Sequence, residues 1–220
     1  MPQASSQANS QANTTSWHLR RLVDFAEPRR DDVCLDISPG GSGLALAMAI
    51  RPWVRDVITA RPGSLPTEKF TLVTASLALG RSDDQTALVH DLLQVCEGRL
   101  VLADLVRTRG GDSDRIERLR DPAYTTKRTL TELLDVLKRA GGWARRLDVF
   151  TIERPVEPWL VDAPKPERIR RELIAELDGG PMTGARPRLI GNELWFAQSW
   201  AFFAVEPVSR PRLAPGQPLR

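Results

Sequence analysis

The residues best suited to chemistry lie in the segment 33–47, which reads VCLDISPGGSGLALA. An apolar run leads into Asp36, a glycine-rich turn follows at Gly40, Gly41 and Gly43, and a second apolar run comes after them. Glycines allow positive φ and bring the backbone close to a ligand. A helix that begins after such a turn offers free N–H groups at its start. The pattern therefore predicts a buried strand, a turn and a helix that together hold a nucleotide-like ligand.

Few other side chains suit acid–base chemistry. The sequence has two histidines, His18 and His90, so a histidine acid–base pair would have to use one of them. A solvated place on a helix surface is the plainer interpretation of both. Asp104 ends a predicted strand, at the edge where ligands approach open α/β sheets. Tyr124, in a predicted loop, is a further candidate for carrying a proton.

The hydrophobic pattern predicts the elements that must position these residues. Expected strands cover residues 33–37, 54–59, 71–75, 100–105, 144–152 and 195–205, and the last is expected to be antiparallel at the end of the sheet. Expected helices cover residues 17–26, 43–50, 83–95 and 167–177, with a loop or surface helix over 107–120 and a loop over 155–166. Thr129 and Glu132 predict a capping box at the start of one more helix.

Composition divides the chain into one domain and two tails. Residues 1–16 are rich in Gln, Ser, Asn, Ala and Thr, and we expect them to be disordered. Residues 207–220 form a proline-rich tail, and residues 17–206 make one α/β domain with a sizeable core.

Charge and cysteine content narrow the classes of function. The net charge is +3, and the arginines are spread along the chain, so a nucleic-acid surface is not expected. No apolar run approaches the length of a membrane span, and no metal-ligand spacing occurs around Cys34 and Cys96. Both cysteines are expected to be buried free thiols, which is typical of a cytoplasmic protein.

The segment 33–47 resembles the first motif of the class I S-adenosylmethionine-dependent methyltransferases. In that family the motif runs Val-Leu-Asp-Val-Gly-x-Gly-x-Gly, and here Ser38 and Ser42 stand at two of the glycine positions. Segment 70–79 is similar to the fourth strand of the family, and segments 92–104 and 129–142 are similar to later elements. The likeness covers residues 17–205 and is closest to the quinone C-methyltransferase branch, which acts on small molecules.

This resemblance implies a Rossmann-like methyltransferase fold with a mostly parallel sheet and an antiparallel last strand. It implies S-adenosylmethionine as the cofactor, with Asp36 beside its ammonium group. It places His18 near the mouth of the site, and the residues around Trp159 over the substrate side. The cofactor-binding residues that it implies are Asp36, Ser38, Gly40, Gly41, Gly43 and Ser76.

One part of the family pattern is missing after the second strand. The family has an acidic residue there, which binds the ribose hydroxyls, whereas Thr59 or Ala60 occupies that place here. Only residues 60–69 then lead to the next strand, and a strand–helix–strand unit needs roughly 30 residues. We therefore expect the fold to be reduced by about one helix–strand unit, to fewer than the family's seven strands, with a weakened cofactor site.

Aromatic residues gather in the last strand. Phe196, Trp200 and Phe202 share one strand face, which predicts either core packing or an exposed wall for a partner or an apolar small molecule. A domain that lacks an edge unit is expected to pair, as a homodimer or with a methyltransferase homologue. These three aromatics, or the helix at 167–177, are the expected contact surfaces.

Three functions remain open from the sequence. The chain is an active small-molecule methyltransferase, a repurposed enzyme of the same fold that binds an apolar metabolite, or a non-catalytic partner of an active homologue. The reduced cofactor segment favours the third, and fold similarity alone does not choose among them.

Overall fold

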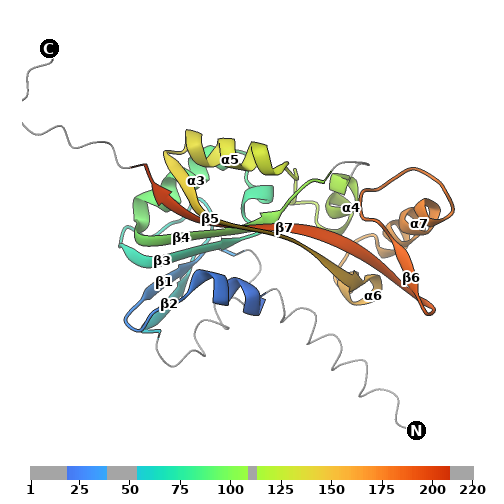
Figure 1. Ribbon diagram of the computed structural model, residues 1–220, viewed down its shortest axis with the longest axis horizontal. Coiled ribbons are helices and arrows are strands. Elements are labelled where there is room, and N and C mark those ends of the chain that lie inside the picture. The colour runs from blue at the N-terminus through green and yellow to red at the C-terminus, as the bar shows by residue number, and fades with distance from the viewer. Residues whose placement is uncertain (1–18, 39–53, 109–112, 209–220) are drawn as a thin grey trace, which may run out of the picture.

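A seven-stranded sheet forms the centre of the molecule (Figure 1). The computed structural model describes residues 19–38, 54–108 and 113–208. The strands are β1 (Val33–Asp36), β2 (Asp56–Thr59), β3 (Phe70–Ser76), β4 (Cys96–Leu105), β5 (Gly142–Pro155), β6 (Arg188–Ile190) and β7 (Glu193–Pro207). The helices are one over residues 19–26, the short η1 (Leu79–Arg81), α3 (Gln85–Val95), α4 (Ser113–Arg120), α5 (Leu130–Arg139), α6 (Val156–Trp159) and α7 (Pro166–Leu177).

The sheet has a parallel part and an antiparallel part. Strands run in the order β2-β1-β3-β4-β7-β5, with β2, β1, β3 and β4 parallel, and β7 antiparallel to both β4 and β5. The last strand is therefore antiparallel, as expected, but the expectation that it ends the sheet is wrong. It lies between β4 and β5 because its face residues are apolar on both sides, whereas β5 carries polar residues and forms the edge.

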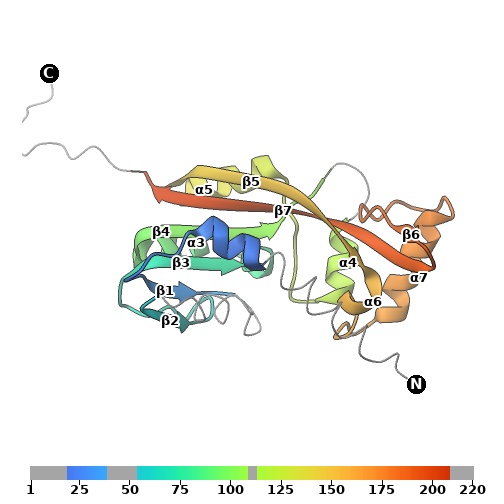
Figure 2. The same ribbon diagram turned by 60° about the horizontal axis from the view of Figure 1, so that its bottom comes forward.

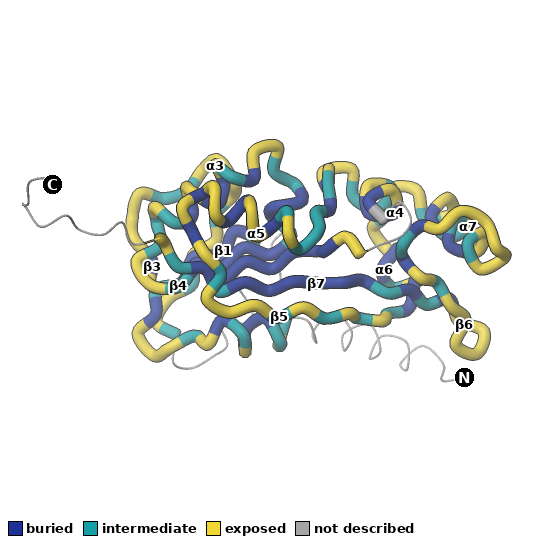
Figure 3. Tube along the Cα trace, turned by 45° about the horizontal axis from the view of Figure 1, so that its top comes forward, coloured by how far each residue is buried: buried dark blue, intermediate teal, exposed yellow. Residues whose placement is uncertain are grey.

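Each face of the parallel part is covered by helices. On one face α3 and α5 bury leucines and valines against residues such as Leu35, Leu102 and Phe203. On the other face the helix over 19–26 buries Leu22 and Val23 against Phe202 and its neighbours. Figure 3 shows β7 buried along most of its length and β5 largely exposed.

Strands β5 and β7 continue beyond the parallel strands and carry a second group of elements (Figure 2). There α4, α6 and α7 surround a third apolar cluster, with Phe196 of β7 at its centre. The short strand β6 forms a hairpin with β7 at this far end. Most of this extension comes from the chain after β5, whereas α4 comes from before it, and α6 lies where the sequence predicts only a loop.

The expected loss of a helix–strand unit is confirmed. The link between Thr59 and Phe70 contains neither a helix nor a strand, only an isolated bridge between Arg61 and Ser64 around Gly63, whose φ is +79°. Positive φ there suits glycine. The expectation of fewer than seven strands is wrong as a count, because the unpredicted β6 brings the total to seven.

Other expectations are met in part. The capping box of Thr129 and Glu132 is present at the start of α5. Cys34 is buried, which raises its pKa to about 12, and Cys96 is only half-buried. Phe196, Trp200 and Phe202 are all buried within the chain, so their proposed role as a contact surface is wrong.

Several expectations concern parts of the chain outside the described residues. They include the two tails, the helix at 43–50, His18, and the glycines Gly40, Gly41 and Gly43. Within the described ranges, the helices are all too short or too polar to cross a membrane.

Gly80 provides a test of how tightly η1 is packed. A Cβ at this position would lie 2.1 Å from a ring carbon of Tyr124, so Gly80→Ala should lower the free energy of unfolding by about 1–3 kcal/mol. Urea unfolding measures the change. Ser82→Ala, two residues further along, serves as the control and should shift the value by no more than about 0.5 kcal/mol. Equal effects of the two variants would contradict the packing argument.

Candidate functional site

The chain changes direction across the sheet at β1. It continues from β1 to β2 on one side and returns to β3 on the other, so the carboxyl ends of β1 and β3 diverge at a topological switch point. Ligands of open α/β sheets bind at such points. The last residues of these strands, Asp36 and Ser76, are both on the implied cofactor list.

Three of the implied cofactor residues come together in a hydrogen-bond network at this point. Asp36 is only 1% exposed, and its Oδ1 accepts hydrogen bonds from the Ser38 hydroxyl at 2.6 Å and the Thr74 hydroxyl at 3.1 Å. The Ser38 hydroxyl also accepts a hydrogen bond from the backbone N–H of Ser76 at 3.2 Å. Ser38 therefore links β1 to β3, a role that the glycine of the family motif cannot perform.

The residues at the switch point fit one end of the implied cofactor. A buried carboxylate held by two hydroxyl donors is a suitable partner for a ligand ammonium group. Asp36 has that geometry, so it would hold the amino-acid end of S-adenosylmethionine.

The end of β2 does not fit the ribose. The backbone N–H of Ala60 donates to the Asp36 carbonyl oxygen at 3.1 Å, which places Ala60 directly beside the site. Its methyl group offers no acceptor for ribose hydroxyls. Arg61 and Ser64 then close a tight turn, so this end of the described site lacks the carboxylate that the family pattern supplies.

The backbone just after β3 connects this network to a larger hollow. Leu77 has a φ of +56°, uncommon for a leucine, and its N–H donates to the Ala103 carbonyl oxygen at 2.8 Å. Such strained residues gather at ligand sites, where surrounding contacts hold them in place. Leu77 follows Ser76 of the network and lines the cavity described next.

A cavity of about 320 Å³ lies at the carboxyl ends of β3 and β4. Small-molecule sites occupy about 300–1,000 Å³, so this cavity has the size of such a site. The elements α4, α6, β5 and β7 complete its walls. The lining residues are Leu77, Arg81, Leu105, Glu117, Arg120, Asp121, Tyr124, Arg154, Pro158, Trp159, Asp162, Gln198 and Trp200.

The sequence anticipates only part of this cavity. Pro158 and Trp159 lie in its wall, and the expectation that residues around Trp159 cover the substrate side stays a prediction. Arg120, Arg154 and Gln198 are missed. One signal was present: Gln198 lies between Phe196 and Trp200 on the same strand face, and it interrupts an otherwise apolar stripe.

Asp104 and Tyr124 form a buried pair beside the cavity. The Tyr124 hydroxyl donates to Asp104 Oδ1 at 2.7 Å, and the backbone N–H groups of Gly80 and Leu105 donate to the same carboxylate at 3.1 and 2.8 Å. Burial raises the pKa of Asp104, and burial together with the Asp104 charge raises the pKa of Tyr124 well above its usual value. A tyrosine held this way keeps its proton at neutral pH, so the pair fixes η1 and the loop around Tyr124 in place.

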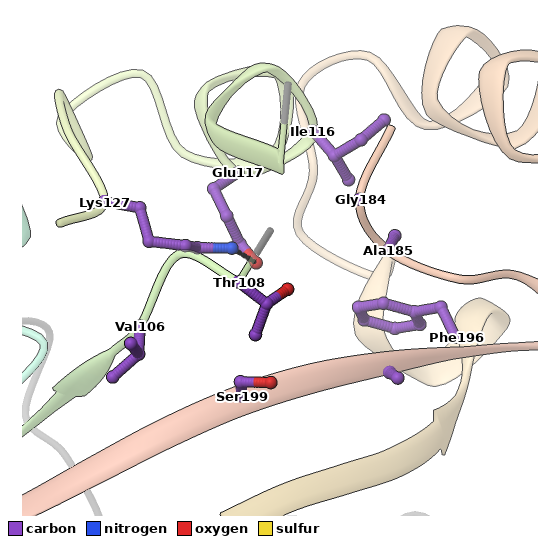
Figure 4. A pocket seen from close by; sticks show the side chains of 10 residues that line it. Val106, Thr108, Ile116, Glu117, Lys127, Gly184, Ala185, Phe196 and Ser199 are labelled. Carbon is purple, nitrogen blue, oxygen red and sulfur yellow. Dashed lines mark hydrogen bonds and ion pairs between the residues drawn. The ribbon is translucent and has the colours of Figure 1, made fainter. Parts of the chain in front are cut away.

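A second, much smaller cavity lies between α4 and β7 (Figure 4). Glu117 and Lys127 meet there at 3.5 Å, both buried, and Gln198 Nε2 donates to Glu117 Oε1 at 2.9 Å. Its volume of about 10 Å³ has room for no more than one water molecule. The polar groups around this small cavity therefore stabilise the ion pair of Glu117 and Lys127.

His90 does not join either group. It lies on an exposed position of α3 and is absent from the residues that line both cavities. Within the described ranges, no three His, Cys, Asp or Glu residues are grouped so that they could hold a metal ion.

Comparison with known proteins supports the fold. No family model and no curated protein sequence matches the chain. Among solved structures, a putative methyltransferase from Bacillus halodurans has a TM-score of 0.69 at 20% identity, with 85% of this chain and 97% of that chain covered. The YcgJ protein from Bacillus subtilis also has a TM-score of 0.69, at 17% identity over 86% of this chain and 97% of that chain.

A third structure contains a ligand. A SAM-dependent methyltransferase from Geobacter sulfurreducens, in complex with S-adenosyl-L-homocysteine, has a TM-score of 0.52 at 13% identity over 86% of this chain and 90% of that chain. The chain therefore has the Rossmann-like fold of the SAM-dependent methyltransferases.

The buried pair gives a pH-dependent prediction. Tyr124→Phe removes one donor from a buried carboxylate and should lower the free energy of unfolding by about 2 kcal/mol at neutral pH. The Tyr124 hydroxyl lowers the pKa of Asp104, so its loss raises that pKa further above the unfolded value. A raised folded-state pKa contributes stability that is lost as the pH rises, so the variant's deficit should grow from about pH 4 to pH 7.

Urea unfolding at several pH values measures this deficit. Thr125→Val is the matched control, since its hydroxyl donates only to the neutral Gly80 carbonyl oxygen, at 3.1 Å. The deficit of the control should stay constant with pH. A deficit of Tyr124→Phe that is equally constant would show that the hydroxyl does not act on the Asp104 charge.

Proposed function

We propose that this chain is a methyltransferase-like protein of small-molecule metabolism that acts as a non-catalytic partner of an active homologue. The observation that supports this most directly is the link from Ala60 to Phe70, which contains no helix or strand where the adenosine half of a cofactor site would lie. A cavity of small-molecule size is present at the carboxyl ends of β3 and β4.

The energetic consequence of that link is a weak cofactor site. Each oriented hydrogen bond to the ribose or adenine contributes about 0.5–1.5 kcal/mol, and more where a carboxylate accepts it. The loss of three such bonds weakens binding by about one to three orders of magnitude. Asp36 and its hydroxyl partners would still favour the amino-acid end, so we expect weak binding through that end alone.

Two other functions use the same geometry. The intact Asp36 network and the cavity support an active SAM-dependent small-molecule methyltransferase. The cavity alone supports a repurposed enzyme of the same fold. The three proposals differ in whether cofactor binds and whether it reacts.

Calorimetric titration with S-adenosylmethionine and S-adenosyl-L-homocysteine separates them. We expect dissociation constants above about 1 mM for both ligands, which corresponds to a binding free energy weaker than about −4 kcal/mol. Any measured binding should be lost in Asp36→Ala, because the ammonium loses its charged partner. It should survive in Asp91→Asn, which changes an exposed carboxylate on α3. Micromolar binding to the wild-type chain would overturn the non-catalytic proposal and support the active enzyme.

The partner role needs a surface at which to associate, and the structure offers the open edge of β5. In the described part of the sheet β5 pairs only with β7. Leu147 and Val149 lie two positions apart, on the same face of this edge strand, and the two residues are 41% and 47% exposed. Exposed strand edges with apolar side chains favour pairing with another chain. We therefore propose that a dimer, with itself or with a homologue, forms through β5.

Sedimentation tests this association. Leu147→Glu should shift a dimer toward monomer, and because Leu147 is exposed the variant should fold normally. Ile58→Glu is the matched control, since Ile58 is 40% exposed on β2 at the opposite edge of the sheet. A dimer that survives the first change and is lost in the second would place the interface at β2. A wild-type chain that stays monomeric, alone and with its nearest homologue, would contradict the partner role.

A further inference from the structure

The cavity at the ends of β3 and β4 contains positive charge that its own acidic residues do not neutralise. Three arginines line it, Arg81, Arg120 and Arg154, together with three acids. The arginines and the acids are equal in number, but the arginines are not all paired with these acids.

Two of the acids already pair with cations, one inside the cavity lining and one outside it. Asp121 forms an ion pair with Arg81, whose Nε donates to Asp121 Oδ2 at 2.8 Å. Glu117 lines both this cavity and the small cavity of Figure 4. Lys127, which lines only the small cavity, forms an ion pair with it at 3.5 Å. The third acid, Asp162, is exposed at the rim, where water screens its charge.

Arg154 is the least satisfied of the cations. Its Nη1 donates to Gln198 Oε1 at 3.3 Å, and its buried Nε has no hydrogen-bond partner within the described residues. Burial and, to a smaller extent, the neighbouring positive charge of Arg120 lower the pKa of Arg154 to about 10, while the charge of Glu117 opposes the shift. The guanidinium remains charged at neutral pH, so a partly buried cation faces the cavity without a carboxylate of its own.

Arg120 is positioned beside it. Its Nε donates to the Trp159 carbonyl oxygen at 3.0 Å, and its guanidinium lies 5.4 Å from the centre of the Trp159 ring. These contacts hold Arg120 in place but do not neutralise it. Two arginines that repel each other across a cavity favour an anion between them, because the guanidinium geometry matches a carboxylate.

The rest of the wall is apolar and aromatic. Trp159, Trp200 and the ring of Tyr124 line the cavity, together with Leu77 and Leu105. Aromatic walls favour a flat apolar ligand, which they contact over a large area.

We propose that this cavity binds a small planar aromatic carboxylate, with its carboxylate between Arg120 and Arg154 and its ring against Trp159 and Trp200. The inference deepens the proposed function, since it names the class of small molecule that the cavity takes. It does not depend on whether the chain binds or uses a cofactor.

Direct binding of model acids tests the proposal in the absence of any cofactor. Calorimetry would compare benzoate, salicylate, 1-naphthoate and 2-naphthoate with the uncharged 2-naphthamide. At least one acid should bind saturably below about 1 mM. The amide of the same ring should bind about tenfold more weakly or worse, because it cannot pair with the two arginines. No saturable binding of any acid, or equal binding of 2-naphthoate and 2-naphthamide, would overturn the proposal.

Variants locate the site. Arg154→Gln and Arg120→Gln should each weaken acid binding about tenfold, while Arg145→Gln, an exposed arginine outside the cavity, should leave it unchanged. Arg154→Met should lose acid binding and raise the thermal unfolding midpoint, since it removes a buried, incompletely paired charge. A higher unfolding midpoint would show that Arg154 does not stabilise the fold, and this separates a ligand-binding role from a purely structural one. Acid binding that Arg154→Gln leaves intact, or an unfolding midpoint that Arg154→Met lowers, would overturn the assignment.

The outcome is independent of the cofactor titration. If S-adenosylmethionine also binds tightly, the non-catalytic proposal fails while the carboxylate site stands. If neither the acids nor the cofactor bind, the carboxylate site fails while the non-catalytic proposal stands.

Discussion

The burial of β7 on both faces is the constraint on which the rest of the structure depends. This strand pairs with β4 over residues 200–205 and with β5 over almost its whole length. Phe203 packs toward α3 and α5, Phe202 packs toward the helix over 19–26, and Phe196 packs among α4, α6 and α7. One strand therefore supplies side chains to all three apolar clusters. A polar substitution at any of these phenylalanines would leave a buried group without hydrogen-bond partners.

The same strand also defines the candidate ligand cavity. Between its two apolar ends, Gln198 and Ser199 are polar and buried. Gln198 bonds to both Glu117 and Arg154, so it connects the buried ion pair of α4 to the cation of the cavity. Polar groups inside an apolar strand are costly unless they are satisfied, and here a neighbouring helix and the edge strand satisfy them. The position of the cavity follows from this interruption of the core.

Regular periodicity explains which parts of the fold the sequence predicts. The apolar runs at β1 and β3, the amphipathic α7 and the capping box of α5 all lie close to their predicted positions because each is determined by neighbours in the sequence. The start of β4 is missed because residues near Gly98 are polar and resemble a turn. Gly98 instead lies in the strand, where a Cβ would come within 2.2 Å of the Thr71 carbonyl oxygen. The place of β7 inside the sheet depends on partners distant in sequence, which no local pattern reveals.

The sequence likewise predicts one part of the candidate site and misses the other. Asp36, Ser38 and Ser76 come together because a strand–turn motif and a parallel neighbour are enough to place them. Arg120 and Arg154 come from a helix and an edge strand 34 positions apart, and they share a cavity only after β7 has brought α4 and α6 around Phe196. The hydrogen-bond network at the switch point is thus built from local sequence, and the cavity from long-range packing. A chain can lose a local segment, as the short link after β2 shows, while the core that forms the cavity stays intact. The cavity and the short link after β2 are therefore physically compatible in one fold, and the unpartnered Nε of Arg154 in the cavity wall is the feature that the proposed carboxylate ligand would explain.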